Sequence, residues 1–337
     1  MPSKPKTALV ISGGGAKGAF AVGVVKHLYK NYRKTGWFAI TGGSSTGALI
    51  SPMAACIAAP DPMGKQAFET LEYIYTHVAT SDILEKQNIF ELMQRQDCLN
   101  ESDPLNNLLH RELKQEWFDW LRKPSSPDCY VVYVNYQSGQ KVAVTPKDTG
   151  MTRERFIQAM LASASVPVVM EATLINNEVC YDGGVRDLLP FSKAIELGAE
   201  KIVPVFLSPE EFGRTENRFR RMDKILLRTL DILLDEASRN DVAMAQLINI
   251  GVQAKEDLYA QFDKDKPILN KIKAILSKKE FKDLFGSDKR LLKIITGIRP
   301  DFHLTDDSLS FDPVKMKQWV DLGEQKAAQV IQQSPFI

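Results

Sequence analysis

Twice within its first sixty residues, the chain passes from a short apolar run through a glycine-rich turn into a helical pattern. The first passage leads from residues 7–11 into a helix predicted over residues 17–32. The second leads from residues 37–40 into a helix predicted over residues 46–59. Strands that alternate with helices pair in parallel, because each helix carries the chain back to the starting edge of the sheet. The sequence therefore predicts an α/β fold with a largely parallel sheet.

The second turn, Gly43-Ser44-Ser45-Thr46-Gly47, matches the G-x-S-x-G pattern of a nucleophile elbow. Such an elbow holds its central serine on a strained bend, with the hydroxyl exposed above the edge of the sheet. The helix that follows directs its amide groups and its positive dipole end at the same point. Because the pentapeptide stands between an apolar run and a helical pattern, we interpret Ser45 as a nucleophile rather than as part of a simple turn.

The first turn, Ser12-Gly13-Gly14-Gly15-Ala16-Lys17-Gly18, contains three consecutive glycines. Inward-pointing amides of such a loop bind a phosphate or the oxyanion of an acyl-transfer intermediate. A Walker A loop does not fit, because Lys17 precedes Gly18 instead of following a glycine and preceding a hydroxyl residue. A dinucleotide pattern can be drawn through Gly13, Gly15 and Gly18, but the acidic residue expected about 20 positions later is missing. Only the acyl-transfer interpretation uses both turns.

A serine nucleophile needs a base. Asp182 is the carboxylate candidate, because it ends a short strand pattern and is followed by two glycines that allow close approach to another loop. An Asp-Gly hairpin turn is the alternative interpretation of this segment. Of the four histidines, His303 fits the chain order Ser, Asp, His of a triad with Ser45 and Asp182. The residues alone therefore leave a dyad and a triad open.

Four blocks of the sequence together resemble the bacterial patatin-like phospholipases, a family of serine lipid acyl hydrolases. They are the glycine loop with Ala19-Phe20, the elbow, the small-residue segment 162–167, and Asp182-Gly183-Gly184-Val185 with the helical pattern that follows it. The resemblance implies a three-layer α/β/α fold with a mainly parallel central sheet and a helical C-terminal insertion. It implies one acyl hydrolase domain over residues 1–337, with core blocks 5–60 and 155–207 and a helical lid or insertion over 208–300.

The catalytic pair of this family is a serine and an aspartate without a histidine, so the resemblance assigns Ser45 as the nucleophile and Asp182 as the base. An unperturbed aspartate has a pKa of about 3.9, so this role requires burial that raises it. The implied substrate is a phospholipid or another acyl ester, and neither a cofactor nor a metal is implied. The resemblance places an oxyanion hole at the backbone amides of Gly13, Gly14, Gly15 and Ala16. It gives supporting roles to Lys17, Gly18, Gly43, Gly47, Gly183 and Gly184.

Lys17 would support the glycine loop or face a lipid head group. The elbow departs from the family pattern at Ser44 and Thr46, where small residues are common. Thr46 adds bulk beside the nucleophile, which leaves the acyl-chain preference open.

Composition narrows the class of protein further. A chain of 337 residues with 44% hydrophobic residues can bury a large core, and a net charge of +1 argues against a general nucleic-acid binder. The sequence shows no signal peptide and no apolar run of membrane-spanning length. Four cysteines without metal spacing predict buried thiols in a reducing compartment. We expect a cytoplasmic protein that meets lipid at the membrane surface, and export as an effector stays open.

Two C-terminal segments bear on membranes. Leu226, Leu230 and Leu233 lie on one helical stripe, which favours an amphipathic core helix over a membrane-surface helix. Residues 264–293 hold ten Lys or Arg against four Asp or Glu, beside several isoleucines and leucines. This segment is either a solvated basic face or a peripheral contact with an anionic membrane.

The remaining patterns predict one helix over residues 103–121, hairpins over 130–144 and 171–181, and a strand over 201–207. Pro204 indicates that this last strand is at an edge or irregular. Residues 80–102 form either a lid or a plain surface connection. Two rival functions remain: a general esterase or acyltransferase on the same dyad, and a nucleotide-binding or interaction module without catalysis.

Overall fold

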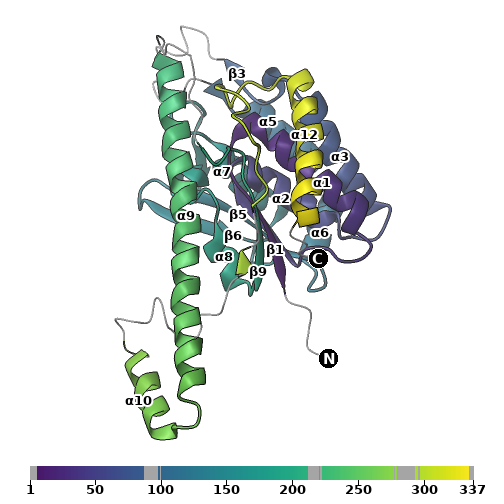
Figure 1. The fold of residues 1–337 in the computed structure, drawn as a ribbon. Coiled ribbons are helices and arrows are strands. Elements are labelled where there is room, and N and C mark those ends of the chain that lie inside the picture. The colour runs from purple at the N-terminus through teal and green to yellow at the C-terminus, as the bar shows by residue number, and fades with distance from the viewer. Residues whose placement is uncertain are drawn as a thin grey trace.

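A mixed sheet forms the centre of the computed structural model, which describes residues 6–86, 98, 100–211, 220, 222–276, 278, 293–294 and 297–333. Its strand order is β10-β9-β1-β2-β5-β8-β7, and β6 pairs with β5 (Figure 1). The parallel strands are β1 (Thr7–Ile11), β2 (Ile40–Ser44), β5 (Asp128–Asn135), β9 (Lys201–Val205) and β10 (Lys293–Ile294). The antiparallel strands are β6 (Gln140–Val144), β7 (Thr173–Ile175) and β8 (Glu178–Asp182). A separate antiparallel pair joins β3 (Glu85–Lys86) and β4 (Asn100–Glu101).

Helices cover both faces of this sheet (Figure 1). Leu9 and Ile11 of β1 face the larger core, to which α1, α2, α3 and α12 contribute. Ala8 and Val10 face a smaller core that includes residues of α8 and α9. The bounds of these helices are α1 (Gly18–Tyr32), α2 (Thr46–Cys56), α3 (Met63–His77), α8 (Phe191–Glu196), α9 (Met222–Gln261) and α12 (Pro313–Gln333). The remaining helices are α5 (Asp103–Glu112), α6 (Gln115–Leu121), α7 (Arg153–Ala164) and α10 (Lys266–Leu276), with short 3-10 turns η1 (Gly15–Lys17), η2 (Thr80–Asp82) and η3 (Gly183–Val185). The expected three-layer α/β/α fold with a helical C-terminal region is confirmed.

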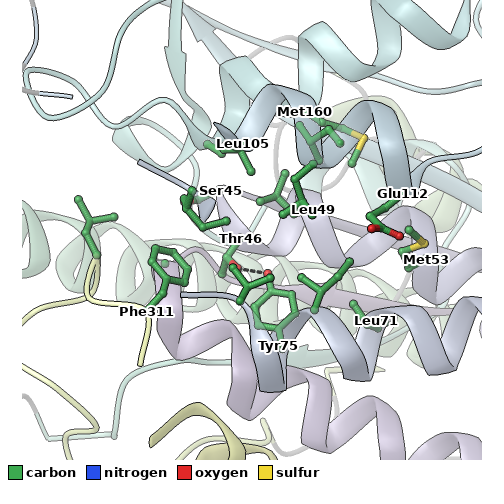
Figure 2. Close-up of a pocket in the computed structure, with 18 of the residues that line it drawn as sticks. Ser45, Thr46, Leu49, Met53, Leu71, Tyr75, Leu105, Glu112, Met160 and Phe311 are labelled. Carbon is green, nitrogen blue, oxygen red and sulfur yellow. Dashed lines mark hydrogen bonds between the residues drawn. The ribbon is translucent and has the colours of Figure 1, made fainter. Parts of the chain in front are cut away.

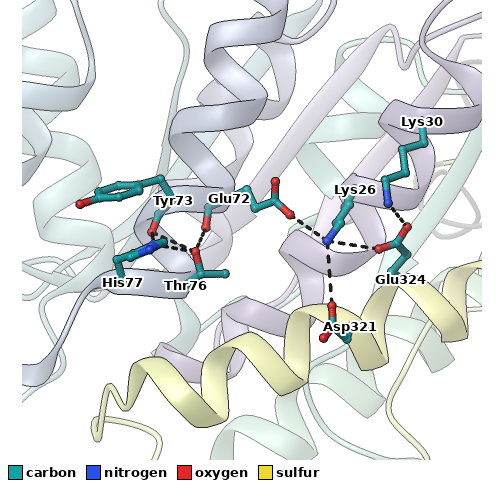
Figure 3. A network of polar contacts seen from close by, with 8 residues as sticks. All are labelled: Lys26, Lys30, Glu72, Tyr73, Thr76, His77, Asp321 and Glu324. Atoms are coloured by element: carbon teal, nitrogen blue, oxygen red, sulfur yellow. Dashed lines mark hydrogen bonds and ion pairs between the residues drawn. The ribbon is translucent and has the colours of Figure 1, made fainter.

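The last helix, α12, packs against the first. An ideal Cβ on Gly23 of α1 would lie 1.9 Å from the carbonyl oxygen of Val320, so the two helices approach as closely as backbone allows. Charges join α3 to this pair, since Lys26 Nζ lies 2.8 Å from Glu72 and 3.4 Å from Glu324 (Figure 3). These groups are partly exposed, so the ion pairs add little stability beside the buried contact between α1 and α12.

One local prediction was wrong, and one alternative of another is excluded. Residues 103–121 form two helices, because Leu113 and Lys114 have ψ angles of 83° and 152°, outside the helical range. The strand with Pro204 is not at an edge, since β9 lies between β1 and β10, but its pairing is irregular. Among the described residues, β10 pairs only with Lys201 and Ile202, and beyond them the Pro204 carbonyl accepts a hydrogen bond from the Ile298 amide. Pro204 therefore lies where the ladder between β9 and β10 has ended.

Within the described part of the chain, no helix combines the length and the apolar character that crossing a membrane requires. Residues 87–97, which belong to the segment interpreted as a lid or a surface connection, lie outside the described residues.

Candidate active site

The predicted elbow is a sharp turn between β2 and α2. Ser45 has φ 56° and ψ −129°, a conformation that is strained for a residue with a side chain. Its amide donates to Ser163 Oγ at 3.0 Å, and Ser163 Oγ donates in turn to the carbonyl of Val132 on β5. The strain at Ser45 is therefore held in place by α7 and the central sheet. The neighbouring Ser44 donates its hydroxyl to the Asp187 carbonyl at 2.6 Å and is fully buried, which leaves Ser45 as the nucleophile candidate of this turn.

The glycine loop lies directly against the elbow. An ideal Cβ on Gly13 would lie 2.9 Å from Ser45 Cβ, so any larger residue would push the loop away from the serine. Gly15 has φ +56°, and its Cβ would lie 2.1 Å from the carbonyl oxygen of Ser308. The other glycines predicted to support the site are also closely surrounded by neighbouring atoms. An ideal Cβ would lie 2.4 Å from the Ile11 carbonyl oxygen at Gly43 and 2.2 Å from it at Gly47. It would lie 2.4 Å from Thr46 Oγ1 at Gly18, 2.1 Å from the Val132 carbonyl oxygen at Gly183 and 3.0 Å from Asp182 Oδ1 at Gly184.

Three amides of the glycine loop remain available as donors. In the described structure, the amides of Gly13, Gly14 and Gly15 have no protein acceptor. The Ala16 amide, in contrast, donates to the Ser308 carbonyl at 2.7 Å. An amide engaged in this way is not free for an oxyanion. The geometry therefore narrows the expected oxyanion hole to the three glycines.

Asp182 meets Ser45 at the end of β8. The Ser45 hydroxyl lies near enough to the Asp182 carboxyl to lower its pKa, and Asp182 Oδ1 accepts the Gly184 amide at 2.7 Å. The Asp182 amide donates to the Ser165 carbonyl at 2.8 Å, which fixes the end of the strand against α7. The structure thus brings together two residues that the sequence placed on separate blocks.

The environment of Asp182 changes its acidity. Burial raises the pKa of this carboxyl to about 7, while the hydrogen bonds from Ser45 and Gly184 act in the opposite direction. Asp182 is 5% exposed and Ser45 8% exposed, so little water reaches the pair. A carboxyl group with this pKa is poised to accept and release a proton near neutral pH.

Lys17 is buried and forms an ion pair with α9. Its Nζ lies 3.5 Å from Asp231 of α9, and both side chains are buried. Of the two interpretations of Lys17, support of the loop or contact with a head group, the geometry favours support.

His303 lies near the Lys17–Asp231 ion pair, because both charges act on its pKa. Its Nε2 lies 3.3 Å from Asp306 Oδ1, and its pKa is lowered, first by burial and next by the charge of Lys17. Asp182 Oδ1 instead accepts the Gly184 amide, and the Ser45 hydroxyl lies near enough to this carboxyl to lower its pKa. The geometry therefore favours the dyad over the triad.

An apolar pocket extends from the candidate serine into the larger core. Figure 2 shows Ser45 at one end and Met53 with Glu112 at the other. The wall carries one polar pair, Thr46 Oγ1 and Tyr75 OH, whose oxygens lie 2.5 Å apart. A pocket of this character accommodates an alkyl chain rather than a nucleotide.

Sequence reasoning missed several contributors to the site. The roles of Ser163 and Ser165 depend on the packing of α7 against β5 and β8, although both residues lie in or near the small-residue segment of the resemblance. The pocket walls from α3 and α5 read in the sequence as ordinary amphipathic helices. The described residues contain no group of three or more His, Cys, Asp or Glu arranged to hold a metal ion.

Comparison with known proteins gives two similarities. A family model described as patatin-like phospholipase matches residues 9–195, which is more than half of the chain and includes Ser45 and Asp182. Among solved structures, the crystal structure of VipD from Legionella pneumophila aligns over 98% of this chain and 67% of that chain, with 12% sequence identity and a TM-score of 0.47.

Proposed function

This chain belongs to the patatin-like phospholipase family, and from that premise we propose that it is a lipid acyl hydrolase of the phospholipase A or lysophospholipase type. Ser45 attacks the carbonyl carbon of the ester while Asp182 takes the hydroxyl proton. The negative charge passes to the carbonyl oxygen, and the amides of Gly13, Gly14 and Gly15 donate hydrogen bonds to this oxyanion. When the tetrahedral intermediate collapses, Asp182 returns the proton to the departing alcohol and an acyl-serine remains.

The second half of the cycle reverses these roles. Asp182 takes a proton from water, and the resulting hydroxide attacks the acyl-serine carbonyl. The second tetrahedral intermediate uses the same amides, and its collapse releases the fatty acid and returns the proton to Ser45. One oxyanion donor commonly contributes 10²–10³ in rate. With an aspartate as the only base, we expect at least this dependence on the glycine loop.

One observation carries the proposal: Ser45, at the end of an apolar pocket, lies beside the buried Asp182, whose carboxyl pKa is raised to about 7. The pair supplies the reacting groups and the pocket suits an acyl chain. Neither feature is needed by an interaction module that only keeps the scaffold.

The proposal includes peripheral contact with anionic membranes, while nucleic acid is not a partner. Lys266, Lys271 and Lys273 of α10 are exposed, and the helix carries no acidic residue. Ile268 and Ile275 on the same helix are 40% and 49% exposed. Exposed lysines beside exposed isoleucines suit a surface of anionic lipid.

The test is release of fatty acid from phospholipid vesicles, measured beside hydrolysis of a soluble short-chain ester. The proposal predicts that both are hydrolysed and that Asp182→Asn hydrolyses neither. Hydrolysis of the soluble ester alone would instead support a general esterase. No hydrolysis of either substrate, together with thermal stabilisation by a nucleotide, would contradict the proposal and favour the non-catalytic alternative.

A further inference from the structure

The apolar pocket follows three helices for nearly the same distance. Its lining runs along α2 from Thr46 to Met53, along α3 from Leu71 to Val78, and along α5 from Leu105 to Glu112. Each of these stretches covers seven residue steps, which corresponds to a rise of about 10 Å. Three independent walls thus define a pocket with one length.

The length of the pocket gives the number of carbon atoms of an acyl chain that it can hold. Met53 follows Ser45 by eight residues on α2, a rise of about 12 Å. A fully extended chain rises about 1.2 Å per bond, since an extended residue with three backbone bonds spans about 3.3–3.6 Å. An acyl chain bound to Ser45 therefore reaches Met53 after about ten bonds.

Two different groups line the pocket at its end opposite Ser45. Met53 is buried and lies there beside Glu112 (Figure 2). Beside it, the Glu112 carboxylate lies 2.7 Å from Arg111 Nε and keeps about a fifth of its surface in water, at 21% exposure. A longer chain would have to displace Met53 and press a methyl group against this carboxylate, which removes water from a charge at a large cost.

We propose that Met53 and Glu112 limit the acyl chain, so that this protein prefers chains of about eight to ten carbons over chains of sixteen. The inference rests on the function proposed above and adds the substrate class. Up to the limit, each added methylene exchanges water for the apolar wall, which is worth up to about fourfold in affinity. The Thr46–Tyr75 pair does not interrupt this gain, because its two hydroxyl groups already bond to each other.

The experiment measures kcat/KM of the full chain on a series of esters that share one leaving group and carry acyl chains of two to sixteen carbons. The expected profile rises to a maximum at about eight to ten carbons and falls at least tenfold at sixteen. Met53→Ala removes three side-chain atoms from the closed end, so its maximum should move two or three carbons longer. Leu49→Trp fills the channel about 6 Å from Ser45, one helical turn along α2, and should move the maximum to about four or five carbons.

Met244→Ala is the matched control, because Met244 is 57% exposed on α9, outside the pocket lining, and its loss should leave the profile unchanged. Labelling with a fluorophosphonate verifies that Ser45 is reactive in each variant. A wild-type maximum at sixteen carbons, or a maximum that neither pocket variant moves, would overturn the length limit while the hydrolase function stands. No hydrolysis at any length would overturn the proposed function and the limit with it. The wild-type profile decides the question even where a variant does not fold.

Discussion

Asp182 has to remain ionised often enough to act as a base and yet hold a proton firmly enough to receive one from serine. Its burial raises the pKa to about 7, and the hydrogen bonds from Ser45 and the Gly184 amide limit the rise. The same residue therefore connects activity and stability to pH. Both dependences follow from its surroundings and not from its residue type, since an exposed aspartate titrates at about 3.9.

Activity should depend on the ionised form of Asp182. Because only the carboxylate accepts a proton, kcat/KM is predicted to be constant above pH 7 and to fall about tenfold per pH unit below it.

The free energy of unfolding should change with pH in the opposite sense. The pKa of Asp182 is higher in the folded than in the unfolded chain, so the stabilising contribution of this group, present below about pH 4, is lost as pH rises through about 7. Asp182→Asn should therefore be inactive and more stable than the wild type at pH 8, with a smaller difference at pH 5. The measurements are a pH–rate profile and thermal unfolding at both pH values. Activity that persists unchanged to pH 5 would contradict the assignment of Asp182.

Comparing kcat/KM of two variants, Asp182→Asn and His303→Ala, distinguishes a Ser-Asp dyad from a Ser-Asp-His triad. Asp182→Asn is predicted to lower kcat/KM more than about 10³-fold, because it removes the base. His303→Ala is predicted to lower it less than about tenfold, because His303 pairs with Asp306, whereas the Ser45 hydroxyl lies near enough to Asp182 to lower its pKa. Circular dichroism checks that both variants fold. A folded His303→Ala variant with a loss above 10³-fold would restore the triad.

Contacts between elements explain what the sequence could and could not predict. Residues near each other in the chain predicted β2, the elbow and α2, because strand, glycine turn and helix are adjacent there. The pattern across 103–121 could not reveal the break between α5 and α6, since Leu113 and Trp117 are buried and continue the apolar period. The stripe on α9 was misread as a core face: Leu233 is 59% exposed, whereas Asp231 and Asp235 are buried. Around Asp231 a polar side of α9 faces inward, and Asp231 pairs there with Lys17, a partner too distant in sequence to be recognised.

The Lys17–Asp231 pair links the glycine loop to α9. Lys17→Met would leave the Asp231 carboxylate buried without its partner, which typically costs about 3–5 kcal/mol of unfolding free energy. Replacing both groups, with Lys17→Met and Asp231→Leu, removes the charge as well, so the double variant should be more stable than the single one. Urea unfolding of the wild type and the two variants tests this. Equal stability of the single variant and the wild type would show that the pair does not support the loop.

At the scale of the whole molecule, Ser45 and α10 lie far apart. Figure 1 shows α9 running the length of the body and projecting past it, with α10 beside the projecting end. Ser45 follows the carboxyl end of β2, whereas α9 carries the chain past the opposite end of the strands. Membrane contact through α10 would therefore act on the position of the protein and not on the dyad. The single-domain assignment and a cytoplasmic location both stay predictions from the sequence.

Charge reversal on α10 and just after it separates these two effects. Changing Lys271 and Lys273 of α10, and Lys278 beyond its end, to Glu is predicted to weaken co-sedimentation with anionic vesicles. The reason is that each engaged lysine contributes about 1 kcal/mol at low salt. Hydrolysis of a soluble ester should stay within about twofold of the wild type, because α10 is remote from Ser45. Neutral vesicles and high salt provide the controls. Equal sedimentation of the triple variant and the wild type at low salt would leave these lysines as a solvated surface.

Labelling with a fluorophosphonate, followed by peptide mapping, tests whether Ser45 is the nucleophile. We expect one modified residue, Ser45, in the wild type, and no labelling in Ser45→Ala, whose stability should stay within about 1 kcal/mol because the hydroxyl contributes little to packing. Ser44→Ala is the control, since the Ser44 hydroxyl is bonded to the Asp187 carbonyl and its loss should leave Ser45 reactive. A label on another residue, or one that persists in a folded Ser45→Ala variant, would show that Ser45 is not the nucleophile.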